Sequence, residues 1–467
     1  MTAHFKRIRA VPLVLALCFL AAFLSGCGTG QEPAQKPKTI VTVWSKDRHD
    51  SAYQMDRVRA YNESNPDNIQ VDYRIFSDNY LQSLDSVFQS GRAPDLMAYT
   101  DQVFYRFYAQ DRFADLAPYM DEEFHALFDD VLLDGVNVLD GACLFVPTCA
   151  TTPRLFYNQT IFDRLGIDAP PATMEEMIEN CRLITTQLSE EGIYGFAVNF
   201  YSASSALERS LLAQGTSNLG LKAGYDFGAG CYDFRQYEEL LEQWRVLLAP
   251  DCAYPRCAQL DIDPLRQLFA DGKIGMYISY IHSEAGVYQS QFPMAERWGC
   301  APLPAGAELV VGAQNYSLNG GYLLNKASEI PEAAWKVYRA LFADEDTLTD
   351  YYEAGYGVSI VPKVLNRAAS DGYTPPQAAL LLGEGDQLWP LAPQEENPAA
   401  VDVEGADYCT VFKELIFGSS PIAPALDELT ERYNAAYQTG VAAGTGRMIC
   451  RPGFDPLHPR NAAEVRS

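Results

Sequence analysis

At the start of the folded chain, segments with the apolar pattern of a strand alternate with segments whose apolar residues have helical spacing. Residues 40–44 (IVTVW) and 95–99 (DLMAY) are short apolar runs of strand-forming residues, and residues 69–75 alternate apolar and polar positions. Between them, residues 51–65 and 80–88 carry apolar side chains at helical spacing. The order strand, helix, strand, helix, strand predicts a parallel sheet with crossover helices, and hence an α/β protein.

The ends of these three strands carry aromatic and polar side chains. The segments that follow them are residues 44–47 (WSKD), 76–78 (FSD) and 99–102 (YTDQ). Ligands of open α/β sheets bind beyond the carboxyl ends of the strands, so these segments are candidate binding positions. The alternative is that Trp44 and Tyr99 only close the hydrophobic core.

The same pattern starts again in the middle of the chain. We expect strands at residues 144–147, 155–157, 194–200 and 274–279, and helices through residue 165, over 174–188, from 263, over 331–342 and from 421 to about 439. Residues 377–407 show little periodicity and are rich in Pro, Gly and acids. Residues 441–467 are expected to be loosely ordered.

The extreme N-terminus has the pattern of a secretory signal. Lys6, Arg7 and Arg9 precede the apolar residues 11–24, whose fourteen residues would span about 21 Å of a ~30 Å hydrocarbon core. A basic head, a short apolar run and small residues after it indicate a cleaved signal at residues 1–26.

Residues 24–27 (LSGC) resemble the lipobox of bacterial lipoproteins. The resemblance implies cleavage before Cys27, which then carries a diacylglyceryl group and anchors the chain to the bacterial cell membrane from outside the cytoplasm. Residues 27–38 contain almost no apolar side chains and predict a flexible tether. The alternative is a short membrane anchor with an incidental cysteine.

Composition limits the possible partners of the mature chain. Removal of the first 26 of 467 residues leaves 441, enough for two or three domains, with 61 acids against 32 Lys and Arg and a net charge of −29. Such a charge repels phosphate backbones, so nucleic acid is not an expected partner.

Residue types that carry chemistry are sparse. Of eleven Cys, nine remain after the signal and Cys27; Cys143 with Cys149 and Cys252 with Cys257 are close enough in sequence to pair, but most are expected to be small buried residues. The chain contains no C-x-x-C, H-E-x-x-H, G-x-S-x-G or phosphate-binding loop motif. We therefore expect no metal, no cofactor and no enzyme activity.

Six stretches, taken in order, resemble the extracellular solute-binding proteins of ABC importers, the maltose-binding-protein-like group. They are YNESNPDNIQVDY from residue 61, FQSGRAPDLMAY from 88, FVPTCATTPRLFYNQTIFDRLGIDAPPATMEEMI from 145, FADGKIGMYIS from 269, GCAPLPAG from 299 and NGGYLLNKASEIPEAAWKVYRALF from 319. Met174 stands where the family usually has Trp, and residues 377–407 have no clear counterpart.

The resemblance implies a two-lobed periplasmic-binding-protein-like type II fold, with a hinge and an interlobe cleft. The chain would cross between lobes near Val146-Pro147, Asn315-Tyr316 and Tyr373-Pro376. The expected N-terminal lobe is then residues 39–147 plus 316–372, and the C-terminal lobe residues 148–315 plus 373–440. Closure around the ligand would be a hinge motion.

Aromatic faces suit the C–H faces of a sugar, and carboxylates and amides suit its hydroxyls. By position in the family pattern and at strand ends, the expected ligand-binding residues are Trp44, Asp78, Tyr99, Asp101, Gln102, Thr151, Asn199, Tyr201, Tyr280, His282 and Tyr316. His282 could equally be a surface histidine.

The sequence thus predicts a monomeric, lipid-anchored protein that captures a mono- or oligosaccharide and delivers it to the permease of an ABC importer. One alternative is a non-sugar solute such as a polyol phosphate or a peptide. Another is a surface glycoside hydrolase, for which Asp47, Asp78 and Asp101 are the candidate carboxylate pair.

Replacement of the proposed lipid-bearing cysteine tests the anchor. Cys27→Ala is expected to leave the protein secreted or unprocessed, because no sulfur nucleophile remains to be acylated. Mass spectrometry of the membrane fraction measures the lipid on the unaltered protein. A native chain found unlipidated and in the cytoplasm would contradict the prediction.

Overall fold

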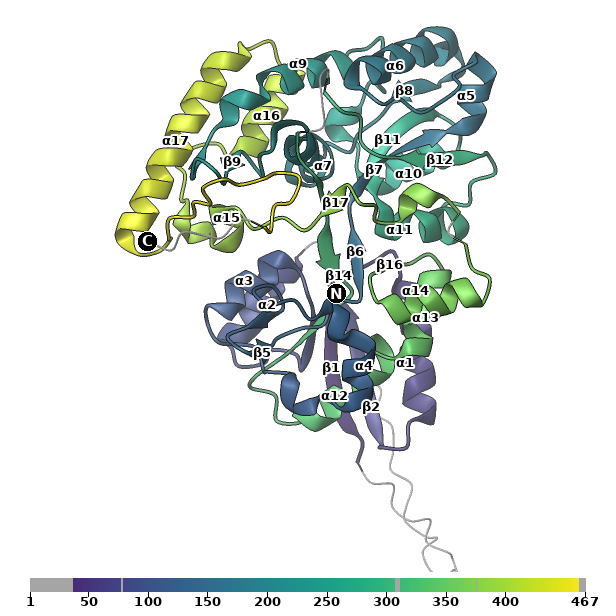
Figure 1. Ribbon diagram of the computed structural model, residues 1–467. Helices are drawn as coiled ribbons and strands as arrows, with labels where there is room; N and C mark the ends of the chain where they lie inside the picture. The colour runs from purple at the N-terminus through teal and green to yellow at the C-terminus, as the bar shows by residue number, and fades with distance from the viewer. Residues whose placement is uncertain (1–36, 77–78, 307–310, 375, 462–467) are drawn as a thin grey trace, which may run out of the picture. The chain divides into compact units, whose positions relative to one another are not determined.

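The computed structural model describes residues 37–76, 79–306, 311–374 and 376–461. Cys27, Asp78 and the predicted signal lie outside these residues. Two separate hydrophobic cores divide the rest into two lobes (Figure 1). The first lobe is built around the core that draws on residues 41–146 and 318–368, and the second around the core that draws on residues 155–300 and 380–449.

The sheet of the first lobe has the predicted parallel strands. β1 (Thr39–Ser45) lies between β2 (Ile69–Ile75) and β3 (Leu96–Ala98) and is parallel to both. β15 (Tyr322–Leu324), which comes after the whole central part of the chain, adds antiparallel to β3. Along β1, alternate apolar side chains such as Val41 and Val43 are buried in the core. The polar side chains that follow the strand ends are not needed for this packing and are available for a binding site.

Helices α1 and α12 pack on this sheet, α1 against β2 and α12 against β1 and β15. The other helices and strands of the lobe are shorter than these two. The bounds are α1 (Ser51–Ser64), α2 (Tyr80–Gln89), α3 (Asp101–Tyr108), η1 (Ala117–Tyr119), α4 (Glu122–Phe128), η2 (Asp129–Val131), β4 (Val138–Leu139), β5 (Ala142–Cys143), α12 (Pro331–Phe342), α13 (Glu345–Glu353) and α14 (Pro362–Ser370).

The second lobe contains a mixed sheet in the order β12-β7-β11-β8. Only β11 and β8 run parallel; β7 is antiparallel to β11 and to β12. The strands are β7 (Pro153–Asn158), β8 (Tyr194–Phe196), β11 (Ile274–Tyr280) and β12 (Trp298–Ala301), with the small ribbon β9 (Tyr225–Asp226) and β10 (Cys231–Tyr232).

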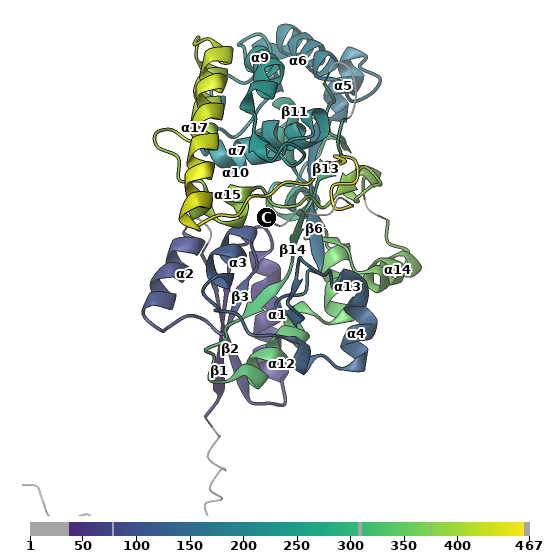
Figure 2. The ribbon, with the colours of Figure 1, turned by 60° about the vertical axis from the view of Figure 1, so that its left-hand side comes forward.

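Helices surround this sheet, and the longest, α17, runs along one edge of the lobe beside α16 (Figures 1 and 2). The helices are α5 (Gln159–Leu165), α6 (Met174–Leu188), η3 (Ser189–Glu191), α7 (Ala203–Arg209), α8 (Leu211–Gln214), η4 (Gly215–Leu219), η5 (Phe234–Tyr237), α9 (Glu238–Leu247), η6 (Cys257–Gln259), α10 (Ile262–Ala270), α11 (Ile281–Gly286), η7 (Val287–Gln291), η8 (Ala378–Leu380), α15 (Pro393–Glu396), η9 (Pro398–Ala400), α16 (Tyr408–Phe417) and α17 (Ile422–Ala443).

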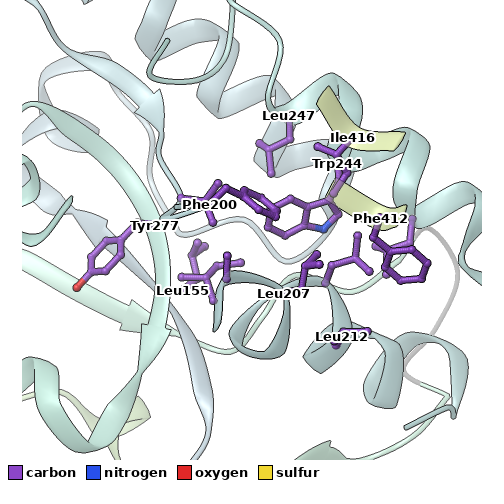
Figure 3. Close-up of a cluster of buried hydrophobic side chains, with 14 of the residues drawn as sticks. Leu155, Phe200, Leu207, Leu212, Trp244, Leu247, Tyr277, Phe412 and Ile416 are labelled. Carbon is purple, nitrogen blue, oxygen red and sulfur yellow. The ribbon is translucent and has the colours of Figure 1, made fainter. Parts of the chain in front are cut away.

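Trp244 lies in the centre of the second core. Figure 3 shows it packed among Phe200, Leu247 and Ile416, with Phe412 nearby. The indole is fully buried, and its N–H donates to Gln214 Oε1 at 2.7 Å, so burial leaves no unpaired donor. The second lobe is therefore a packed body of its own.

Three short strands join the lobes. β6 (Cys149–Thr151) lies between β14 (Ser317–Asn319) and β16 (Val358–Ser359), and it is antiparallel to both. A further parallel pair, β13 (Gln314–Asn315) with β17 (Asp386–Gln387), lies where the chain returns to the second lobe. These strands form the hinge region.

Two predicted strands differ in the structure. Residues 144–147 form no strand, because their backbone groups bond to side chains: Phe145 O accepts from the Asn137 amide at 2.9 Å and Val146 N donates to the Tyr338 hydroxyl at 3.3 Å. The strand expected over 194–200 ends at Phe196. Ala197 N still donates to Met276 O of β11, but Phe200 N donates to Cys257 O at 3.1 Å, so the last of these residues are held by the segment before α10 instead of by a neighbouring strand.

All nine cysteines that the structure describes are free thiols, and seven of them are buried, in accord with small core residues. The irregular segment that follows α17 is anchored to the second lobe: Ile449 is buried, and its carbonyl accepts from the hydroxyl of Tyr225. Within the described residues, no helix is both long enough and apolar enough to span a membrane.

A buried ion pair fixes the returning chain to the second sheet. The Arg154 guanidinium of β7 donates to both carboxylate oxygens of Asp386, at 3.0 and 2.5 Å, and both residues are at least nine-tenths buried. The same guanidinium donates to Ala379 O at 3.1 Å. Two such bonds in parallel fix geometry as well as charge.

Removal of the Asp386 charge is expected to destabilise the protein. Asp386→Asn leaves the Arg154 charge buried and uncompensated, which should lower the free energy of unfolding by about 3–5 kcal/mol. Urea unfolding followed by tryptophan fluorescence measures the change. Asp111→Asn is the control, because its partner Lys326 is exposed and the loss should stay below about 1 kcal/mol. Equal losses in the two variants would contradict the prediction.

Candidate ligand-binding site

The end of β3 presents a tyrosine and an aspartate together. Thr100 caps α3 by accepting from Val103 N at 3.0 Å, so Asp101 begins the helix, where a carboxylate is favoured. The ring of Tyr99 stacks on Phe145 at 3.9 Å and is 5% exposed, while its hydroxyl donates to Asp101. Tyr99 thus belongs to the core and also orients the Asp101 carboxylate.

The end of β1 adds charged groups on the same lobe. Trp44 is buried against Phe76, with ring centroids 4.1 Å apart. Lys46 forms an ion pair with Asp47 at 3.4 Å. Burial alone would raise the pKa of Asp47, but neighbouring positive charge, above all that of Lys46, outweighs it and lowers the pKa. Asp47 is therefore ionised at neutral pH, which suits a hydrogen-bond acceptor and does not suit a general acid.

The second lobe contributes Glu208 and Arg209 from the end of α7 and Tyr280 from the end of β11. The Arg209 guanidinium lies over the Tyr280 ring, 5.2 Å from its centroid, and donates to Ser205 O and Oγ. This arrangement holds the ring and the cation in a fixed relation at the end of the strand.

A buried ion pair supports these residues from behind. Glu284 is fully buried and accepts from Arg266 at 2.7 Å and from the Ser279 hydroxyl at 2.5 Å. The Arg266 charge keeps the pKa of Glu284 below its usual value although burial acts in the opposite direction. The pair fixes the turn between β11 and α11, and with it Tyr280 and His282.

His282 lies at the hinge. Its Nδ1 is 2.7 Å from Thr151 Oγ1, and its ring meets the His49 ring edge-on at 5.1 Å. Burial, and then the charge of His49, holds the pKa of His282 well below its ordinary value, so the ring is neutral. Nearby, Gly286 N donates to Gly355 O at 3.0 Å, a close approach of α11 to the first lobe that a Cβ at Gly286 would obstruct.

Glu208 of the second lobe lies within range of charged groups from both lobes. Its side chain is exposed, yet the surrounding protein and the charges of Glu395 and Asp101 raise its pKa to about 7, against the opposing effect of Arg209 and Lys46. Asp101 and Lys46 belong to the first lobe. Glu208 therefore lies near the recess between the lobes, within electrostatic range of both.

A cavity of about 900 Å³ continues this recess from Asp101 toward the C-terminal segment. Its walls come from both lobes and from the hinge strands. At this place α15 of the second lobe lies beside α3 of the first (Figures 1 and 2). Aromatic, carboxylate, amide and basic groups all line it, among them Tyr99, Asp101, Tyr105, Asn315, Tyr316, Trp389, Glu396, Asn397, Arg447, Arg451 and Arg460. The volume lies in the range of small-molecule sites.

The structure brings together some of the predicted site residues and not others. Tyr99, Asp101 and Tyr316 line the cavity, and Thr151, Tyr280 and His282 lie around the recess. Gln102 is exposed on α3 and is not among the described residues of the cavity wall; Tyr201 is 70% exposed. Asn199 is buried in the second lobe, where its Oδ1 has no hydrogen-bond partner among the described residues.

Several residues of the site were not foreseen. Glu208 and Arg209 sit on a helix that the apolar pattern did not reveal, since α7 is only seven residues long. Trp389 comes from the aperiodic segment 377–407, and its N–H donates to Ala313 O at 3.0 Å. A single tryptophan in an acidic, irregular stretch was the available signal, because such a large apolar ring needs a partner surface.

Two α/β lobes, joined by short strands and with a polar recess between them, are the architecture of a solute-binding protein. The chain belongs to the family of bacterial extracellular solute-binding proteins, whose model matches residues 46–347. It is 24% identical to a candidate binding protein of Brucella abortus over 295 residues, which is 61% of this chain and 67% of that protein.

Solved structures show the same fold at lower identity. The substrate-binding protein Lmo0181 of Listeria monocytogenes, in complex with cycloalternan, superposes with a TM-score of 0.66 at 16% identity, covering 87% of this chain and 99% of that one. A solute-binding protein of Thermotoga lettingae bound to α-D-tagatose gives 0.64 at 17% identity, over 86% and 100%. The predicted two-lobed α/β fold and the family resemblance are confirmed.

The pKa of Glu208 predicts how stability varies with pH. A carboxyl whose pKa rises from 4.5 in the unfolded chain to about 7 holds its proton in the native state, so stability falls as pH rises from about 4.5 to 7. Glu208→Gln should flatten this fall in melting temperature. Glu190→Gln, at an exposed position outside the recess, should keep the original slope. A Glu208→Gln slope equal to that of the unaltered protein would contradict the assignment.

Proposed function

We propose that this protein captures a mono- or oligosaccharide in the recess between its lobes and delivers it to an ABC importer. The observation that carries the proposal is the cavity of about 900 Å³, whose wall combines aromatic rings with carboxylate and amide groups from both lobes. The membership in a family of solute-binding proteins supports it. So do the saccharides bound by the similar structures, cycloalternan and tagatose.

The chemistry of the wall matches the two kinds of surface on a sugar. Trp389, Tyr316 and Tyr105 offer faces or edges against which C–H groups can pack. Asp101, Asn315 and Asn397 offer acceptors and donors for hydroxyls. Asp101 is especially suited because Tyr99 orients it and because it begins a helix, so its position does not depend on the ligand.

Capture requires the lobes to move about the hinge strands. We take the N-terminal lobe as residues 39–147 plus 316–372 and the C-terminal lobe as residues 148–315 plus 373–440. Closure is driven only by contacts that the open form lacks, so a ligand that bridges Asp101 and residues of the second lobe favours the closed form. The closed form is then the one that a permease would recognise.

Attachment to the membrane through lipid on Cys27 completes the proposal. It rests on the lipobox-like residues 24–27 and on the polar segment that follows them. A mature chain of net charge −29 is repelled by anionic lipid, so a covalent anchor is a suitable means of holding it close to a permease.

A thermal-shift panel of mono- and oligosaccharides tests the function. A ligand at about 100 times its dissociation constant stabilises the native state by about 2.7 kcal/mol, which raises the melting temperature measurably. Asp101→Asn should weaken the best ligand by about 10- to 150-fold, because a charge-assisted hydrogen bond is lost. Calorimetric titration gives the affinities.

Asp111→Asn, in the loop after α3 and outside the residues that line the cavity, is the matched control and should bind as the unaltered protein does. A panel in which no saccharide shifts the melting temperature, while a peptide or polyol phosphate does, would replace the saccharide by that solute. Release of products from oligosaccharides at catalytic protein levels would overturn the binding function altogether.

A further inference from the structure

Basic side chains gather at one end of the cavity. Arg447, Arg451 and Arg460 all come from the segment after α17 and all line the cavity wall, together with Lys222. The cavity wall holds these four cations with four carboxylates, whereas the chain as a whole carries 61 acids against 35 Lys and Arg, so the wall is richer in cations than the rest of the molecule. These three arginines also lie beyond the residues that match the family model.

Each of these cations is held in place. Arg447 pairs with Glu396 at 2.7 Å, and Lys222 pairs with Glu395 at 3.3 Å. The Arg451 guanidinium lies over the Phe227 ring, 6.0 Å from its centroid. Arg460 donates to Asp134 O of the first lobe at 3.3 Å, so the C-terminal segment reaches from the second lobe to the first (Figure 2).

The three arginines are close enough to oppose one another's charge. Burial lowers the pKa of Arg451, and the charges of Arg460 and Arg447 lower it further, while Glu396 alone acts the other way. Arg460 also bears on the hydroxyls of Tyr105 and Tyr316, and these two rings line the same cavity. Like charges gathered beside water and aromatic rings are stabilised when an anion joins them.

The carboxylates of the cavity wall come largely from other elements than the arginines. Asp101, Asp134 and Asp140 belong to the first lobe, where Asp101 accepts from Tyr99 and Asp140 lies beside Tyr108. Glu396 contacts Arg447, one of the three arginines. The cavity wall thus draws its aspartates from the first lobe and its arginines from the segment after α17, with Tyr316 and Trp389 also among the residues that line it.

We propose that the solute is an acidic saccharide, whose anionic substituent binds to the wall formed by Arg447, Arg451 and Arg460 while its rings lie near Tyr316 and Trp389. Guanidinium groups bind carboxylates and sulfates through paired hydrogen bonds, so they recognise either substituent. This inference rests on the proposed saccharide-binding function and specifies its substrate class. The overall negative charge of the protein does not prevent binding of an anionic saccharide, because the charges of the cavity wall are much closer to the ligand.

Matched pairs of ligands test the inference. Calorimetry would compare α-1,4-linked galacturonate trisaccharide with the neutral galactose trisaccharide, a glucuronate-containing with a glucose disaccharide, and a sulfated with an unsulfated galactose disaccharide. The acidic member of at least one pair is expected to bind about tenfold more tightly or better, and to lose that preference as salt is raised. The carboxylate and sulfate pairs distinguish the two kinds of substituent.

Two variants locate the effect. Arg460→Gln removes an exposed cation whose described contact is a single carbonyl, so it should fold normally and abolish most of the preference for the acid. Arg451→Lys should reduce the preference while the charge is kept, because paired hydrogen bonding is lost. Arg297→Gln, an exposed arginine paired with Asp163 elsewhere on the second lobe, should bind as the unaltered protein does.

The possible outcomes distinguish a failure of the acidic substrate class from a failure of the proposed saccharide-binding function. If a neutral saccharide binds at least as tightly as its acidic partner, and Arg460→Gln leaves both affinities unchanged, the acidic substrate class is wrong while the saccharide-binding function stands. If no member of any pair or of the wider saccharide panel binds, the saccharide-binding function fails and this inference with it.

Discussion

The rest of the molecule depends on the way in which two separately packed cores share one short sheet. β6, β14 and β16 contribute only a few residues each, and the lobes on either side have their own hydrophobic centres. Motion about these strands leaves both cores intact, so it costs little packing free energy. Polar and charged groups can therefore collect between the lobes, where an apolar lining would join them permanently.

The electrostatics of the recess follow from this separation. Buried ion pairs such as Arg266–Glu284 and Arg154–Asp386 lie behind the walls, where both partners are fixed. Groups at the walls, such as Glu208 and Asp47, are surrounded by charges of both lobes and keep contact with water. Their pKa values depend on how near the other lobe is, so the recess is the part of the protein most responsive to closure.

Much of the fold could be predicted from the sequence because the local spacing of apolar residues determines its strands and helices. The strands and helices from Thr39 to Ala98 appear within a residue or two of their expected bounds, since alternating and helical spacings there determine which face is buried. The strand predicted at residues 144–147 was wrong because backbone groups there form hydrogen bonds with side chains, and no local sequence pattern indicates such partners. The candidate cavity contains predicted residues where they follow a strand end, as at Asp101, or lie at a lobe crossing, as at Tyr316. Trp389 and the three arginines come from irregular segments whose position is set by distant contacts.

The late return of the chain to the first lobe also governs when the protein can fold. β15 completes the first sheet by pairing with β3, more than 220 residues earlier in the chain, and Arg460 reaches Asp134 O only from the last described residues. Contacts of such long separation form slowly. A nascent chain therefore lacks an edge of its first sheet until residue 324 has been made, and it lacks the Arg460 contact until the last described residues follow. This late completion suits a chain that is exported before it folds, as the proposed signal at residues 1–26 would require.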